Sequence, residues 1–272
     1  MIMKNFYQNK TIIEPSDDLI KLKDLALKTS FVEPNCFNNP LKVVKTWFDE
    51  RFFLYKNIPF ISIKKLNKII DMPINLIMQN TNLISPLQVP LLYVDERKDY
   101  GCFTPIYLEN NENNYDLIFT EIRLNNKNSI FLSLIYLHEI IHIIVENNDS
   151  TITNYKDYEL LPIIFEFLLS DDLGSDIFNF AISYRINQLN NYIDMLFQQN
   201  MLSKIYASSY INSIIIAYEL INFYKSKNLL IKKEFINDLK SILNEKNDVY
   251  WLLEKYNVDY NLSLNKLIKR KG

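Results

Sequence analysis

The segment LHEIIHIIV, residues 137–145, contains the only two histidines of the chain, His138 and His142. They stand four positions apart, and Glu139 directly follows the first of them. Four residues of an α-helix turn the chain by about 400° and advance it by about 6 Å, so both imidazoles would leave the helix in the same direction. Two imidazoles on adjacent turns can bind one tetrahedral Zn²⁺. The spacing therefore predicts a zinc site.

Glu139 would lie about 100° around the same helix from His138. From there its carboxylate could reach a water beside the metal, and so serve as a general base, without binding the metal itself. The alternative is an apolar helix with two buried histidines paired to carboxylates or carbonyls. The uncharged flanks LIYL and IIV favour the metal, because burying two histidines and a glutamate is costly unless something pairs them.

A third protein ligand must be a carboxylate, because the chain has no other histidine. The segment DYELLPIIFEFLLSD offers Glu159 and Glu166, which are seven residues apart and would share a helix face about 10 Å apart, so only one can be the ligand. If Pro162 lies in a first helical turn, Glu159 stands where the helix starts and Glu166 lies well inside it. If Asp157 is the N-cap, Glu159 is helical too.

The elements that must position these residues are predicted to be mainly α-helical, with a small antiparallel β-sheet. Short helices are expected before residue 75: one capped by Ser16, one that begins at Pro40, and one over SIKKLNKII (62–70). From about Val89, the runs VPLLYVDE, GCFTPIYLE and YDLIFTEIRL predict strands. A long apolar helix from Ser129 would carry the histidines, and four or five helices are expected from Tyr158 onward.

Composition excludes several classes of function. The net charge of −2 leaves no basic footprint for nucleic acid, and the start MIMKNFYQNK does not have the pattern of a signal peptide. The apolar run 130–145 is interrupted by three ionisable residues and is short for a membrane span. Cys36 and Cys102 are too few for a disulfide framework. A cytoplasmic protein without nucleic-acid or membrane partners is expected, and no feature indicates an oligomeric state.

HEIIH, followed by Glu159 and then by Glu166 in FEFLL, resembles the catalytic half of the M3 metallopeptidases, the oligoendopeptidase F-like and thimet-type gluzincins. The resemblance covers roughly residues 130–260. It implies a zincin-like core in which Glu159 is the ligand and Glu166 a supporting glutamate. On this basis we expect a helical region over 1–75 and a catalytic region over 76–272, in one compact unit.

The chain departs from the family pattern in several places. Ile141 stands where the family has a glycine, and no histidine accompanies the tyrosines. The loop between His142 and Glu159 is shorter, and most of the helical N-terminal half is missing. Restriction of substrate size depends on that half and is therefore not implied here.

The segment YASSYINSIIIAYELINFYKSK (206–227) resembles the tyrosine-bearing helix of the same family. Tyr206 and Tyr210 are one turn apart, so either phenol could donate a hydrogen bond to an oxyanion opposite the zinc. Packing is the alternative role, since the chain has 18 tyrosines.

The sequence thus predicts a zinc-dependent peptidase that acts on short peptides. An extended peptide could pair with the edge strand near DLIFTEIRL. The rival hypothesis is a catalytically inactive zincin-like scaffold or binding protein.

Overall fold

The computed structural model describes residues 13–34, 40–52, 91–95, 101–109, 115–125, 130–148, 159–243 and 249–269. The chain divides into two compact units, one of Met1–Pro34 with Asn148–Gly272 and one of Asn35–Asn147. The boundary expected at residue 75 and the helix expected at 62–70 lie outside the described residues and stay predictions.

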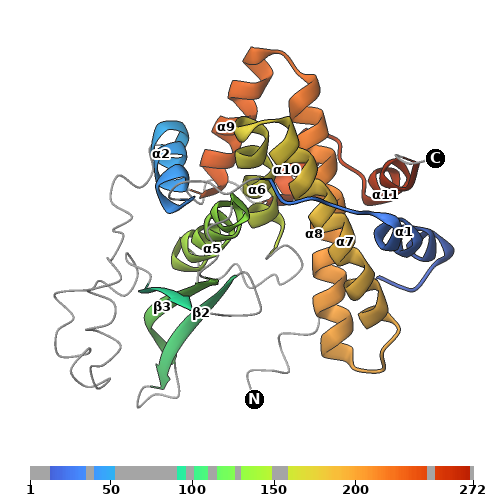
Figure 1. Cartoon of the computed structure of the whole chain (residues 1–272), viewed down its shortest axis with the longest axis horizontal. Helices are drawn as coiled ribbons and strands as arrows, with labels where there is room; N and C mark the ends of the chain where they lie inside the picture. The colour runs from blue at the N-terminus through green and yellow to red at the C-terminus, as the bar shows by residue number, and fades with distance from the viewer. Residues whose placement is uncertain are drawn as a thin grey trace. The chain divides into compact units, whose positions relative to one another are not determined.

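Helices account for most of the described residues, so the predicted mainly helical class is confirmed. In chain order (Figure 1), the helices and strands are α1 (Asp17–Lys28), α2 (Pro40–Phe52), β1 (Leu91–Asp95), β2 (Gly101–Glu109), β3 (Tyr115–Asn125), α5 (Ile130–Asn148), α6 (Leu160–Leu173), α7 (Ser175–Leu196), α8 (Met201–Ser226), α9 (Leu229–Leu243), α10 (Val249–Lys255) and α11 (Tyr260–Lys269). No helix among them is both long enough and apolar enough to cross a membrane.

Helix α1 starts where its sequence predicts. Ser16 has an extended backbone, and its hydroxyl accepts a hydrogen bond from the Leu19 amide at 3.4 Å. This bond satisfies one of the amides that a helix start leaves without an intrahelical partner. The apolar stripe of α1 is buried through Leu19, Leu22 and Ala26, and it packs against α7.

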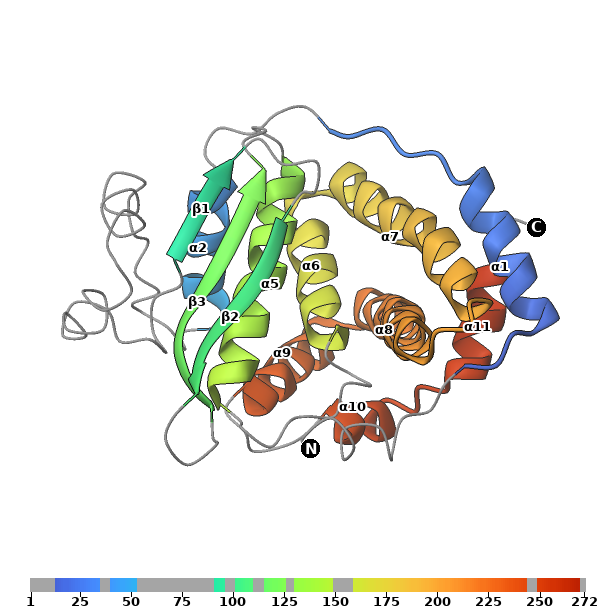
Figure 2. The ribbon, with the colours of Figure 1, turned by 90° about the horizontal axis from the view of Figure 1, so that it is seen from below.

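The three strands form one sheet in which β3 is central, in the order β1-β3-β2 (Figure 2). β2 pairs with β3 in the antiparallel sense, as expected, but β1 pairs with β3 in the parallel sense. The expectation of an antiparallel sheet is therefore wrong for β1. The reason is the crossover: the connection from β1 to β3 contains β2, which lies on the far side of β3.

β3 contains the segment DLIFTEIRL and is the central strand of the sheet, so the strands next to this segment are β1 and β2. Its backbone pairs with β1 over Glu121–Asn125 and with β2 over nearly its whole length. In the described part of the chain, the outer strands of this sheet are β1 and β2, and β1 covers only Glu121–Asn125 of β3, so the pairing of an extended peptide near DLIFTEIRL stays a prediction.

Helices α6 and α7 are joined by Gly174 alone. Its φ of 131° lies in a region that L-residues rarely adopt, and a Cβ there would meet nothing within 4 Å. Conformation, and not lack of space, therefore makes glycine suitable at this position. The Gly174 amide also donates to the carbonyls of Ser170 and Asp171, which closes the end of α6. The conformation of this turn sets the direction of α7 relative to α6.

Helix α8 is central to its unit, where it contacts α6, α7, α9 and α11. Most of its side chains are buried, and an ion pair between Lys225 and Asp171 ties its last turn to the end of α6. The core of this unit therefore lies between α6, α7 and α8, the helices that carry Glu159, Glu166 and the candidate tyrosines.

Candidate metal centre

The HEIIH segment lies inside α5, and every side chain described in this helix, from Ser133 to His142, is buried. His138 is 4%, Glu139 7% and His142 3% exposed. Three ionisable side chains among buried apolar ones need partners that offset the loss of hydration. Burial of this kind was the reason for expecting a metal here.

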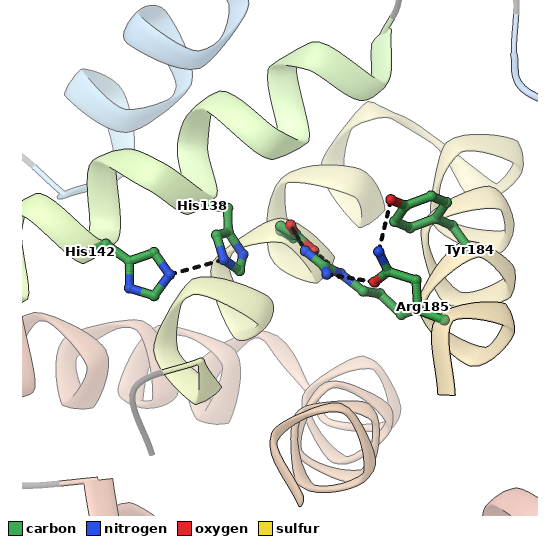
Figure 3. Close-up of polar contacts among 6 residues, drawn as sticks. His138, His142, Tyr184 and Arg185 are labelled. Atoms are coloured by element: carbon green, nitrogen blue, oxygen red, sulfur yellow. Dashed lines mark hydrogen bonds and ion pairs between the residues drawn. The ribbon is translucent and has the colours of Figure 1, made fainter. Parts of the chain in front are cut away.

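The two histidines turn toward each other from adjacent turns of α5 (Figure 3). Their Nε2 atoms are 3.0 Å apart, and their ring centroids are 4.7 Å apart with an angle of 74° between the planes. Two nitrogens bound to one tetrahedral Zn²⁺ at about 2.0–2.1 Å would lie roughly 3.3 Å apart. The observed separation fits a shared metal with a small rotation of the rings. It also fits one hydrogen bond between the two rings.

Glu159 completes a group with the two histidines. One ligand atom of each lies within 4.8 Å of the others, and all three side chains are buried. Two imidazole nitrogens and one carboxylate oxygen are the ligand set of a well-known class of catalytic zinc sites. The three residues therefore fit a metal ion in number, chemical type and separation, and the group could hold one.

The start of α6 shows whether Glu159 lies at the entry of the helix or inside it. Glu159 is the N-cap of α6: its carbonyl accepts the amide of Ile163 at 3.1 Å, while its side chain makes no capping hydrogen bond. Pro162 thus lies in the first turn, where its missing amide costs nothing. Asp157 lies outside the described residues. The positive end of the α6 dipole is favourable for a buried carboxylate at this position.

Glu166 belongs to a different set of contacts. It is 1% exposed, and both of its oxygens accept from the guanidinium of Arg185 on α7: Oε2 from Nε at 2.8 Å, and Oε1 from Nη2. Arg185 also donates to Gln188 at 2.7 Å, and Gln188 donates to the Tyr184 hydroxyl at 2.8 Å (Figure 3). Nothing in the sequence marked Arg185 as the partner of Glu166.

The ion pair with Glu166 keeps the guanidinium of Arg185 charged. Burial alone would lower the pKa of Arg185, but the charge of Glu166 and the hydrogen bonds to it outweigh that effect and raise the pKa. Because the guanidinium donates to both carboxylate oxygens, the ion pair also fixes the relative orientation of the two side chains.

Tyr206 and Tyr210 lie on α8 as predicted, and a third tyrosine joins them from α7. The rings of Tyr192 and Tyr210 are stacked, with centroids 4.4 Å apart and planes 17° from parallel. Tyr206 lies 4.7 Å from Tyr210 and 6.1 Å from Tyr192. Tyr206 is 49% exposed, whereas the other two rings are half-buried. No motif in the sequence around Tyr192 indicates that it joins these tyrosines.

The charge of Glu159 contributes to raising the pKa of two of these phenols. Burial, and then the charge of Glu159, raises the pKa of Tyr210 well above its ordinary value of 10.0. The pKa of Tyr192 is raised by burial, against an opposing effect of Arg185, with Glu159 among the smaller causes. Both phenols therefore keep their protons at neutral pH and can act only as neutral hydrogen-bonding groups.

Comparisons with known proteins gave no match: no family model, no curated protein and no solved structure is similar to this chain. The resemblance to the M3 metallopeptidases stays a prediction, carried by the motif residues alone.

Proposed function

We propose that this protein is a zinc-dependent peptidase, with His138, His142 and Glu159 as the protein ligands. The observation that carries the proposal is the buried group itself, two imidazoles and a carboxylate with ligand atoms within 4.8 Å of one another. Such a set leaves a fourth position open, as catalytic zinc sites do.

The proposed roles follow from residue chemistry. Zn²⁺, when bound, supplies a Lewis acid that polarises a carbonyl and acidifies water. Glu139 follows the first histidine directly and lies on the same helix, so its carboxylate accepts the proton of the attacking water and delivers it to the leaving amine. Tyr210 or Tyr206 donates its phenolic hydrogen to the carbonyl oxygen as negative charge develops there.

The first test measures zinc in protein purified without a histidine tag. We expect about one zinc per chain, because the three ligands and one open position describe a single site. His142→Ala should lose the metal and, with it, the thermal stabilisation that zinc gives the wild type, since a ligand that binds only the native state stabilises it. Metal analysis and thermal unfolding with and without added zinc give both results.

Ile140→Val is the matched control, because Ile140 is a buried neighbour on the same helix. It should cost only about 0.5–1.5 kcal/mol of packing and keep the zinc. A wild type that takes up no zinc would refute the proposal. A zinc-loaded wild type that cleaves no peptide in a mixed library would point instead to a metal-binding scaffold.

The second test compares the two glutamates. Glu159→Gln should weaken zinc binding far more than Glu166→Gln, because the Glu166 carboxylate is engaged by Arg185. A residue that supports a ligand without touching the metal typically changes metal affinity by about 10- to 100-fold, which is the upper range expected for Glu166→Gln. Competition with a chromogenic chelator measures both affinities.

Both variants must be compared at a temperature where unfolding measurements show each to be folded, because Glu166→Gln disturbs a buried ion pair. The opposite ranking, with Glu166→Gln the more damaging, would remove Glu159 from the ligand set.

A further inference from the structure

The packing of α6 against α7 gives Tyr192 a defined place. The two helices are joined by Gly174 and paired by Glu166–Arg185, so they run in opposite directions. Glu159 lies seven residues before Glu166, and Tyr192 lies seven residues after Arg185. Seven residues are nearly two full turns and about 10 Å. Because the two helices are antiparallel, seven residues back along α6 and seven residues forward along α7 reach the same end of the helix pair. Tyr192 therefore lies at the same end of this pair as Glu159.

The ring of Tyr192 then meets Tyr210. The two rings are nearly parallel at 4.4 Å, and they come from neighbouring helices of one unit. A ring held face to face by another ring cannot turn about its χ1 and χ2 bonds without losing that contact. Tyr206, which is on the same helix as Tyr210, is tilted by 55° against it, is half exposed and shares a side-chain hydrogen bond with it, so Tyr206 and Tyr192 contact Tyr210 in different ways.

We propose that Tyr192 is a positioning residue for the peptidase reaction: its stacked ring fixes the direction in which the Tyr210 hydroxyl points beside Glu159. The inference rests on the proposed function, with Tyr210 as the hydrogen-bond donor to the developing oxyanion. Tyr192 itself touches neither zinc nor substrate. The positioning of Tyr210 requires the ring of Tyr192 and does not require its hydroxyl.

The test uses the full chain and separates the ring from the hydroxyl. Tyr192→Phe keeps the stack, whereas Tyr192→Leu and Tyr192→Met remove it, the second with a more flexible side chain in case the first folds poorly. Because a misplaced catalytic group can cost about 100-fold, Leu and Met should lower kcat by about 10- to 100-fold. KM should change by less than about threefold, since a donor to the oxyanion acts mainly in the transition state. Tyr192→Phe should restore kcat to within about threefold of wild type.

Two further measurements exclude a general structural effect. Chelator competition should give the same zinc affinity for all Tyr192 variants as for wild type. In the metal-free protein, the ring resonances of Tyr210 should move in Tyr192→Leu and stay near their wild-type positions in Tyr192→Phe. In a Tyr210→Phe background, Tyr192→Leu should lower kcat by no more than about threefold, because the hydroxyl that it positions is already absent.

Four outcomes would overturn the inference. The first is Tyr192→Leu with wild-type kcat, and the second is Tyr192→Phe with the same loss as Tyr192→Leu. The third is a loss of zinc that parallels the loss of kcat, and the fourth is full additivity with Tyr210→Phe. In each case an active wild type leaves the proposed function standing. A zinc-loaded wild type without cleavage is a separate result that refutes the peptidase and the role of Tyr192 together.

Discussion

Glu139→Gln is expected to keep the zinc and the fold and to reduce peptide cleavage by about 10²- to 10⁴-fold, the usual contribution of a general acid–base group. The side chain is 7% exposed and lies next to the ligand His138, yet it is not part of the group that could hold the metal. Glutamine has nearly the same shape as glutamate but cannot accept the proton. Cleavage of a mixed peptide library, read by mass spectrometry, and zinc content measured on the same samples give the result.

Glu254→Gln is a suitable control, because it makes the same chemical change at an exposed position of α10. It should change neither zinc content nor cleavage. Equal cleavage by Glu139→Gln and wild type would end the assignment of Glu139 as the base. Loss of zinc in Glu139→Gln would show that Glu139 supports the metal, contrary to the roles proposed here.

Arg185→Met is expected to lower the free energy of unfolding by about 3–5 kcal/mol, because it leaves the carboxylate of Glu166 buried without its ion-pair partner. Arg185 is 4% and Glu166 1% exposed, so water cannot replace the lost contact. Methionine keeps most of the apolar stem, so the loss reflects charge more than volume. Denaturant unfolding followed by circular dichroism measures the difference.

The double variant Arg185→Met with Glu166→Leu should recover most of this loss, since replacing both members of a buried pair by apolar residues is often neutral or stabilising. Lys21→Met, which removes the exposed ion pair with Asp18, should change stability little. A single variant Arg185→Met as stable as wild type, or a double variant as unstable as the single one, would contradict this account of the pair.

Much of the local structure was predictable from the sequence. Ser16 caps α1, Pro40 begins α2, and the HEIIH segment lies within one helix. These features depend on the preferences of single residues and on a periodicity of 3.6, which act within a few positions of the chain. For the same reason the facing histidines of α5 could be predicted before any tertiary contact was considered.

The sheet shows where such patterns stop being informative. Each strand was found from its own alternating or apolar run, but a run of this kind does not encode the direction or identity of its partner. Only the path of the chain in space places β3 between β1 and β2 and makes one pair parallel. Strand β3, which contains DLIFTEIRL, is central for this reason.

In the candidate site, the sequence by itself determined which residue types could bind a metal: two histidines on one helix face, and two glutamates seven positions apart. Tertiary structure gives the two glutamates different partners, because Arg185, 19 residues beyond Glu166, donates to both oxygens of that carboxylate, while Glu159 groups with the histidines. It also added Tyr192 to the tyrosines of α8. Helix periodicity fixes the direction in which a side chain leaves its own helix, but its partner depends on how separate helices pack.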